Sequence, residues 1–78
     1  MNRKSKFEIA RDITIDYILH KEQFSEEELC HAIIDHGGIL RISSGQSLNA
    51  YLKYFEESKW IAYHPKTKEY HNLAIQRQ

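Results

Sequence analysis

Apolar side chains in residues 5–22 recur at every third or fourth position, which is the period of an amphipathic helix. We therefore predict a first helix over this range. Its apolar stripe consists of Phe7, Ala10, Thr14, Tyr17 and Ile18, widened by Ile9 and Ile13. Ile15 and Leu19 fall outside the stripe. They extend the core of a small three-helix domain or, alternatively, form a dimer contact.

The start of a second helix is marked more clearly than any other boundary. Ser25 and Glu28 form a capping box, and Phe24 and Leu29 form a hydrophobic staple across it. The residues before the cap, 23–24, predict a very short extended link. Three glutamates, 26–28, complement the helix dipole in the first turn. The helix is expected to end at residues 37–38, where a glycine supplies a left-handed cap. Its buried face consists of Leu29, Cys30, Ala32 and Ile33.

A third helix is predicted over residues 43–58. The preceding segment, 39–42, is compatible with a short strand or with an extended turn. Ser43 or Ser44 caps the helix, since Gln46 and Ser47 occupy the matching capping-box positions. The apolar face of the helix consists of Leu48, Tyr51, Leu52 and Phe55.

The last part of the chain predicts an aromatic hairpin with its turn at Lys66-Thr67. In this register Tyr63 lies across from Tyr70, which is a favourable cross-strand pair. Ile61 and Leu73 then fall on opposite faces, although both are apolar. A bulge near residues 71–72, or another register, is needed to bury both.

The length of 78 residues corresponds to a single domain covering residues 1–78. We expect residues 1–5 to form a flexible basic arm and residues 75–78 a frayed tail. One cysteine excludes an internal disulfide, and no apolar run is long enough to cross a membrane. With no signal-peptide pattern either, the expected location is cytoplasmic, without a membrane partner.

The formal net charge is zero, because 11 Lys and Arg residues balance 11 Asp and Glu residues. Proteins that bind nucleic acids are usually basic overall. Any attraction to phosphate must therefore come from the distribution of charge. The basic residues gather at the N-terminus, with Arg3, Lys4 and Lys6, and at the hairpin turn, with Lys66 and Lys68.

The third helix carries short polar side chains of the kind that read DNA bases. Gln and Asn bond adenine, Ala meets the thymine methyl group, and Lys reaches phosphate or guanine. The helix N-terminus also favours an anion. The alternative is an ordinary solvated helix face. The candidate recognition residues are Ser44, Gln46, Ser47, Asn49, Ala50 and Lys53.

Two further segments are candidates for phosphate contacts. In the hairpin turn, residues 64–69, Lys66 and Lys68 flank Thr67 and are able to straddle a phosphodiester backbone. Lysine and proline are also common in any exposed turn. Arg3 and Lys4 in the N-terminal arm either lie along DNA or serve as a solubilising tail.

Metal chemistry and catalysis find little support. The five histidines and Cys30 lack the spacing of a zinc motif, and Cys30 falls on an apolar helix face. The sequence contains no phosphate-binding glycine loop and no nucleophile elbow. We therefore expect no metal, no cofactor and no enzymatic activity.

The order of helix, short link, capped helix, turn, helix and hairpin resembles the winged helix-turn-helix superfamily over nearly the whole chain. The resemblance is carried by residues 24–29, 44–52 and 55–63. It implies an α+β fold with three helices followed by a C-terminal β-hairpin wing. It also implies sequence-specific DNA binding, often as a dimer on a palindromic site. The link from residue 37 to residue 43 is longer than the tight turn of a standard helix-turn-helix.

These observations favour a small DNA-binding protein that regulates transcription. Helix 43–58 would read the major groove of double-stranded DNA and the 64–69 wing would grip phosphates. The small size is typical of regulators from phages, viruses and plasmids. One bare module buries little DNA and binds weakly, so we also consider a homodimer, held through Ile15, Leu19 or the aromatic hairpin.

The alternative function is a winged-helix module that binds a protein partner. It is favoured by the neutral charge and by aromatic residues of the kind enriched at interfaces. These aromatic residues are Tyr54, Trp60, Tyr63 and Tyr70. A single positive face over the third helix, the wing and the N-terminus would favour DNA. Interruption of that face by Glu56, Glu57 and Glu69 would favour the protein partner.

Overall fold

Helices and short strands alternate along the part of the chain that the computed structural model describes, residues 4–73. Arg3 and the expected tail at 75–78 lie outside these residues. The elements are α1 (Lys6–His20), β1 (Gln23–Ser25), α2 (Glu26–Asp35), β2 (Arg41–Ser43), β3 (Gln46–Ser47), α3 (Leu48–Glu57), β4 (Ile61–His64) and β5 (Glu69–Asn72). Within residues 4–73, no helix has the length and apolar character needed to cross a membrane.

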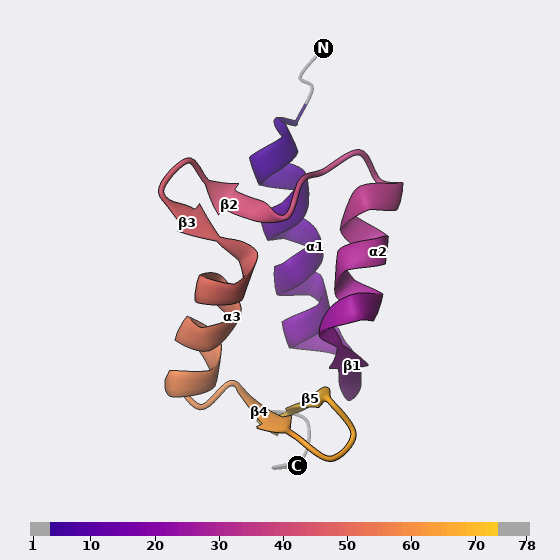
Figure 1. The fold of residues 1–78 in the computed structure, drawn as a ribbon, viewed down its shortest axis with the longest axis vertical. Helices are drawn as coiled ribbons and strands as arrows, with labels where there is room; N and C mark the ends of the chain where they lie inside the picture. Colours follow the sequence, from indigo (N-terminus) through magenta and orange to yellow (C-terminus); the bar gives the residue numbers. More distant parts are fainter. Residues whose placement is uncertain (1–3, 74–78) are drawn as a thin grey trace.

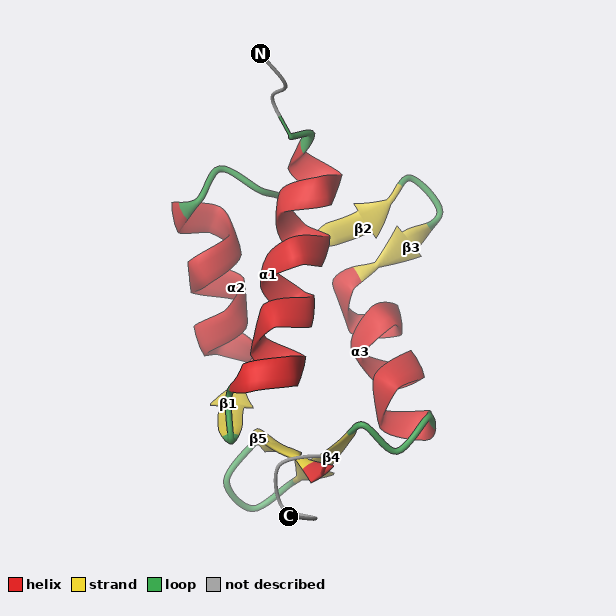
Figure 2. Ribbon diagram, turned by 180° about the vertical axis from the view of Figure 1, so that it is seen from behind, coloured by secondary structure: helices red, strands yellow, loops and turns green. Residues whose placement is uncertain are grey.

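The helix α1 lies between α2 and α3, as Figures 1 and 2 show from opposite sides. The β2–β3 hairpin lies beside the first half of α1. The sheet that contains β4 and β5 lies at the other end of the molecule, below the C-terminal end of α1 (Figure 1). The molecule is a small α+β domain with antiparallel strands.

The predicted starts and ends of the first two helices are largely confirmed. The Ser5 hydroxyl accepts a hydrogen bond from the Glu8 backbone N–H at 3.1 Å, and the Ser25 hydroxyl accepts one from Glu28 at 3.0 Å. Gly37 has φ +85°, the left-handed conformation expected for the residue that ends α2. The first helix stops at His20, two residues before the predicted end.

The predicted order of elements is wrong between α2 and α3. Strands β2 and β3 form a hairpin there, with Ser44-Gly45 as its turn. The helix α3 therefore starts at Leu48, and its cap is Ser47, whose hydroxyl accepts from the Ala50 N–H at 3.2 Å. Several serines in this segment are able to cap a helix. Burial of Ile42 and Leu48 selects Ser47, because it places both side chains in the core.

A three-stranded sheet of order β1-β5-β4 closes the domain, with Tyr63 opposite Tyr70 as predicted. The link at residues 23–24 was expected to be extended, and it pairs with β5 as a full strand. The suggestion that a bulge or another register buries Leu73 together with Ile61 was wrong. The β4–β5 register is regular, so Asn72 and not Leu73 lies opposite Ile61 on the buried face.

Asn72 is buried because it supplies hydrogen bonds to the end of α1 and to the link that follows it. Its side-chain Nδ2 donates to the Ile18 carbonyl, and its backbone N–H donates to the Glu22 carbonyl at 2.8 Å. The last carbonyl groups of a helix have no partner within the helix. A polar residue on the inner face of β5 thus satisfies a helix end that a leucine would leave bare.

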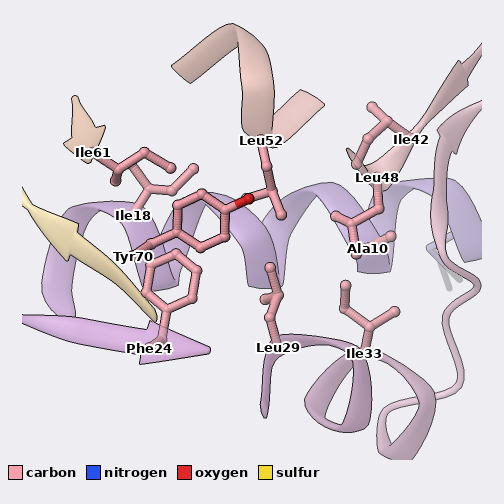
Figure 3. Close-up of a cluster of buried hydrophobic side chains, with 10 residues drawn as sticks. All are labelled: Ala10, Ile18, Phe24, Leu29, Ile33, Ile42, Leu48, Leu52, Ile61 and Tyr70. Atoms are coloured by element: carbon pink, nitrogen blue, oxygen red, sulfur yellow. The ribbon is translucent and has the colours of Figure 1, made fainter. Parts of the chain in front are cut away.

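The hydrophobic core draws on every helix and on both sheets (Figure 3). The Phe24 ring stacks on Tyr70 and meets Tyr17 edge-on, with ring centroids 5.5 Å apart in both pairs. Leu48 and Leu52 anchor the inner face of α3, as predicted. The buried apolar residues are Ala10, Ile18, Phe24, Leu29, Ile33, Ile42, Leu48, Leu52, Ile61 and Tyr70.

The burial of Tyr70 predicts a loss of stability at high pH. Burial raises the pKa of its hydroxyl from 10 to about 12. The raised pKa leaves stability intact below pH 10. Between pH 10 and 12 the unfolded chain loses this proton first, so the free energy of unfolding falls by about 2–3 kcal/mol. Urea unfolding from pH 9 to 12 measures the fall. Tyr70→Phe should remove it, and an unchanged fall in that variant would contradict the prediction.

Candidate nucleic-acid interface

The outward face of α3 is polar and basic in its first two turns and acidic at its end. Asn49, Ala50 and Lys53 are exposed near the start, while Leu48 and Leu52 point inward. The exposed acids at the other end are Glu56 and Glu57. Any attraction of this face for an anion is therefore confined to its N-terminal half.

The β2–β3 hairpin stands immediately before this part of α3 (Figure 1). Arg41 is exposed, and its Nη2 donates to the Ser44 carbonyl at 2.9 Å, across the hairpin turn. The Gly45 N–H donates to the Ser43 hydroxyl at 3.3 Å. The sequence from residue 37 to residue 55 contains no Asp or Glu. The hairpin and the start of α3 thus form a continuous acid-free segment with two cations, Arg41 and Lys53.

The predicted recognition residues are divided among three elements. Asn49, Ala50 and Lys53 lie on the exposed face of α3. Ser44 lies at the hairpin turn, and Gln46 is half-buried in β3. The Ser47 hydroxyl caps α3. The predicted helix over 43–58 is therefore too long at its start, and Ser44, Gln46 and Ser47 are not on its outward face.

Two arginines near this surface were not among the predicted site residues. Arg11 of α1 lies close enough to Tyr51 of α3 for its charge to favour the ionised form of the Tyr51 hydroxyl. Burial has the larger effect and raises the pKa of Tyr51. Arg41 belonged to the segment that the sequence left open between strand and turn. Polar and apolar residues alternate at Arg41, Ile42 and Ser43, as is typical of a half-buried strand. This alternation was the sequence signal that could have predicted an exposed Arg41.

The predicted phosphate-gripping turn, residues 64–69, lies beside the start of α2. Lys68 adopts φ +58°, and its N–H donates to the His64 carbonyl at 2.8 Å. Lys66, Thr67 and Lys68 are exposed. A surface cleft of about 350 Å³ separates the turn from α2, and its lining consists of Ser25, Glu26, Glu27, Tyr63, Thr67 and Lys68. The lysines of the turn therefore share their surroundings with carboxylates.

The basic N-terminus lies far from that turn. Lys4 pairs with Asp12 at 2.5 Å, and the hydrogen bond to this carboxylate raises the pKa of the lysine. Arg3 falls outside the described residues. The N-terminal end of α1 and the β4–β5 sheet lie at opposite ends of the molecule (Figure 1). The third helix, the turn and the N-terminus therefore do not form one positive face, which is the arrangement that would favour DNA over a protein partner.

Aromatic rings form a row along α3 and the turn after it. Phe55 contacts Tyr51, Tyr54 and Trp60, with ring centroids 5.0, 5.4 and 6.5 Å away. Tyr54 is 59% exposed and Trp60 is 43% exposed. Leu19, one of the two residues considered for a dimer contact, is also exposed, whereas Ile15 is half-buried.

Histidine and cysteine residues are scattered. The rings of His64 and His71 lie 3.9 Å apart on β4 and β5. Cys30 is half-buried, and burial raises the pKa of its thiol. Among residues 4–73, no three His, Cys, Asp or Glu side chains are grouped so that they could hold a metal ion.

Comparisons with known proteins give no indication of family or function. No protein-family model matches the sequence, and no match to a curated protein or to a solved structure was found.

Proposed function

We propose that this protein binds double-stranded DNA as a small winged helix-turn-helix regulator, with α3 in the major groove. The observation that carries the proposal is the exposed surface of Asn49, Ala50 and Lys53. These residues occupy the first two turns of a helix whose inner face is held by Leu48 and Leu52. Asn and Ala side chains at such positions are able to contact base edges, and Lys53 is able to reach phosphate or guanine.

The distribution of charge supports DNA binding in spite of the zero net charge. Residues 37–55 carry cations and no carboxylate. The glutamates at 26–28 lie at the start of α2, and Glu56 and Glu57 lie at the far end of α3. DNA that approaches the N-terminal half of α3 therefore meets the positive part of the surface first. Local potentials of this kind steer association even when the whole molecule is neutral.

Apart from the β2–β3 hairpin, the elements follow each other in the order expected from the resemblance to this superfamily. A capped helix precedes α3, and the β4–β5 hairpin follows it and pairs with β1. The β2–β3 hairpin is an addition to the pattern expected from the sequence. From the resemblance to this superfamily we also propose a role in transcription and a homodimer. We propose a cytoplasmic location as well.

A direct test is fluorescence anisotropy with random-sequence duplex DNA over a series of salt concentrations. We expect binding that weakens steeply with salt, because phosphate contacts release counterions. The variant Asn49→Ala/Lys53→Ala should bind about eightfold more weakly at 0.1 M salt. This value follows from the loss of one phosphate contact, which changes the slope of log K against log salt by about 0.9.

The matched control removes negative charge from the same face of α3. Glu56→Gln/Glu57→Gln should bind DNA more tightly than the original chain, because two repulsive charges are removed near the phosphates. Unchanged binding in both double variants would contradict the placement of α3 against DNA. The absence of any binding at low salt would contradict the DNA-binding proposal itself.

A second candidate function is a module that binds a protein partner. It is favoured by the exposed Tyr54 and Trp60 at the edge of the aromatic row, because aromatic residues are enriched at interfaces. Absence of DNA binding at low salt would favour this function. Substitution of Trp60 by Ala would then be expected to weaken partner binding, and Asn49→Ala/Lys53→Ala would not.

A further inference from the structure

The β2–β3 hairpin is held in a fixed position relative to α3. Ile42 in β2 is buried in the core, and β3 passes into α3 without an intervening residue. The Leu48 N–H at the start of α3 donates to the Leu40 carbonyl, just before β2, at 3.3 Å. A ligand that binds to the first turn of α3 therefore meets the β2–β3 hairpin in a fixed position beside it.

The exposed guanidinium of Arg41 is oriented by the hairpin itself. Its Nη2 donates to the Ser44 carbonyl at 2.9 Å, which fixes the side chain across the turn. A guanidinium carries five N–H donors, so others remain for a ligand. Among residues 4–73 no carboxylate forms an ion pair with Arg41. An oriented arginine without a carboxylate partner suits a phosphate, whose oxygens match the planar donor fork.

The turn at residues 64–69 offers a poorer place for a phosphate. Lys68 and Thr67 line a cleft together with Glu26 and Glu27, whose charges oppose the approach of an anion. The turn also lies below α2, whereas α3 lies on the other side of α1 (Figure 1). Of the two hairpins, β2–β3 adjoins the start of α3 and has the more favourable charge.

We propose that the β2–β3 hairpin is a phosphate-binding element, in which Arg41 contacts the DNA backbone beside the groove that α3 enters. The hairpin thereby takes the part that the sequence suggested for the 64–69 turn. The inference rests on the proposed function, since it names the second contact of the same DNA site. The exposed Ser43 and Ser44 hydroxyl groups lie at the same turn and are additional donors to the backbone.

The test compares three variants with the original chain on random-sequence duplex DNA over a salt series. Arg41→Gln should lower the salt slope by about 0.9 and weaken binding about eightfold at 0.1 M salt, independently of DNA sequence. Arg41→Lys keeps the charge but gives up the guanidinium fork, so it should retain most of the slope. Lys66→Gln/Lys68→Gln removes twice as much charge from the other turn and should change the slope less than Arg41→Gln does.

The outcomes distinguish failure of this inference from failure of the proposed function. If Asn49→Ala/Lys53→Ala weakens binding and Arg41→Gln does not, the hairpin contact is wrong and the role of α3 stands. If Arg41→Lys lowers the salt slope as much as Arg41→Gln although circular dichroism shows both folded, the charge at residue 41 does not contact phosphate and the inference fails. A larger slope change in Lys66→Gln/Lys68→Gln than in Arg41→Gln would return the phosphate contact to the 64–69 turn. Absence of DNA binding by the original chain would overturn both proposals.

Discussion

Replacing Phe24 by alanine is expected to remove a large part of the protein's stability. Phe24 is fully buried between the rings of Tyr17 and Tyr70, and it lies on β1 where the sheet meets α1 and α2. Truncation of a buried phenylalanine to alanine costs about 3–5 kcal/mol. A domain of 78 residues has a total stability of roughly 4–12 kcal/mol, so this loss removes much of it.

Urea unfolding monitored by far-ultraviolet circular dichroism measures the loss. The matched control is Tyr54→Ala, which removes an aromatic ring that is largely exposed on α3. We expect this control to lose less than about 1 kcal/mol. Similar losses in the two variants would mean that the packing of Phe24 on Tyr70 is not a main source of stability.

Replacing Asn72 by aspartate is expected to be similarly severe at neutral pH. The change is nearly isosteric, but it removes the Nδ2 donor to the Ile18 carbonyl and places a carboxylate in a fully buried position. An uncompensated buried charge costs about 3–5 kcal/mol. Burial favours the protonated acid, so the variant should regain stability as the pH falls and the carboxyl group becomes able to donate to the Ile18 carbonyl.

Asn72→Leu separates the lost hydrogen bond from the added charge. It leaves the Ile18 carbonyl without this donor and should cost about 1–3 kcal/mol, with no dependence on pH between 4 and 7 beyond that of the original chain. The measurement for both variants is urea unfolding at pH 4, 5.5 and 7. A smaller loss for Asn72→Asp than for Asn72→Leu at pH 7 would contradict the role of Asn72 at the end of α1.

The two positions lie at the end of the domain where β1 and β5 meet α1, and the proposed DNA surface lies on α3 and the β2–β3 hairpin (Figure 1). Lys53 and Arg41 are exposed, so substitutions there should leave stability within about 0.5–1 kcal/mol. Losses of DNA affinity in those variants can then be assigned to the contact itself.

The sequence alone determined the elements whose signals are local. The capped start of α2 depends on Ser25, Phe24 and neighbours within a few residues, and the glycine that ends α2 needs only its own backbone freedom. The apolar stripe of α3 also followed from periodicity, and the pairing of Tyr63 with Tyr70 followed from the position of the turn at residues 66–67. These features were predictable because the interactions that form them join residues close together in the chain.

Tertiary structure decided the choices between locally equivalent alternatives. Several serines were able to cap α3, and the burial of Ile42 and Leu48 selected Ser47 and folded residues 41–47 into a hairpin. The last carbonyls of α1 placed Asn72 inside, where sequence hydrophobicity favoured Leu73. Packing of the 64–69 turn beside the start of α2 separated its lysines from α3. Each of these outcomes depends on partners distant in sequence, and hydrophobic patterning along the chain does not by itself decide between the alternatives.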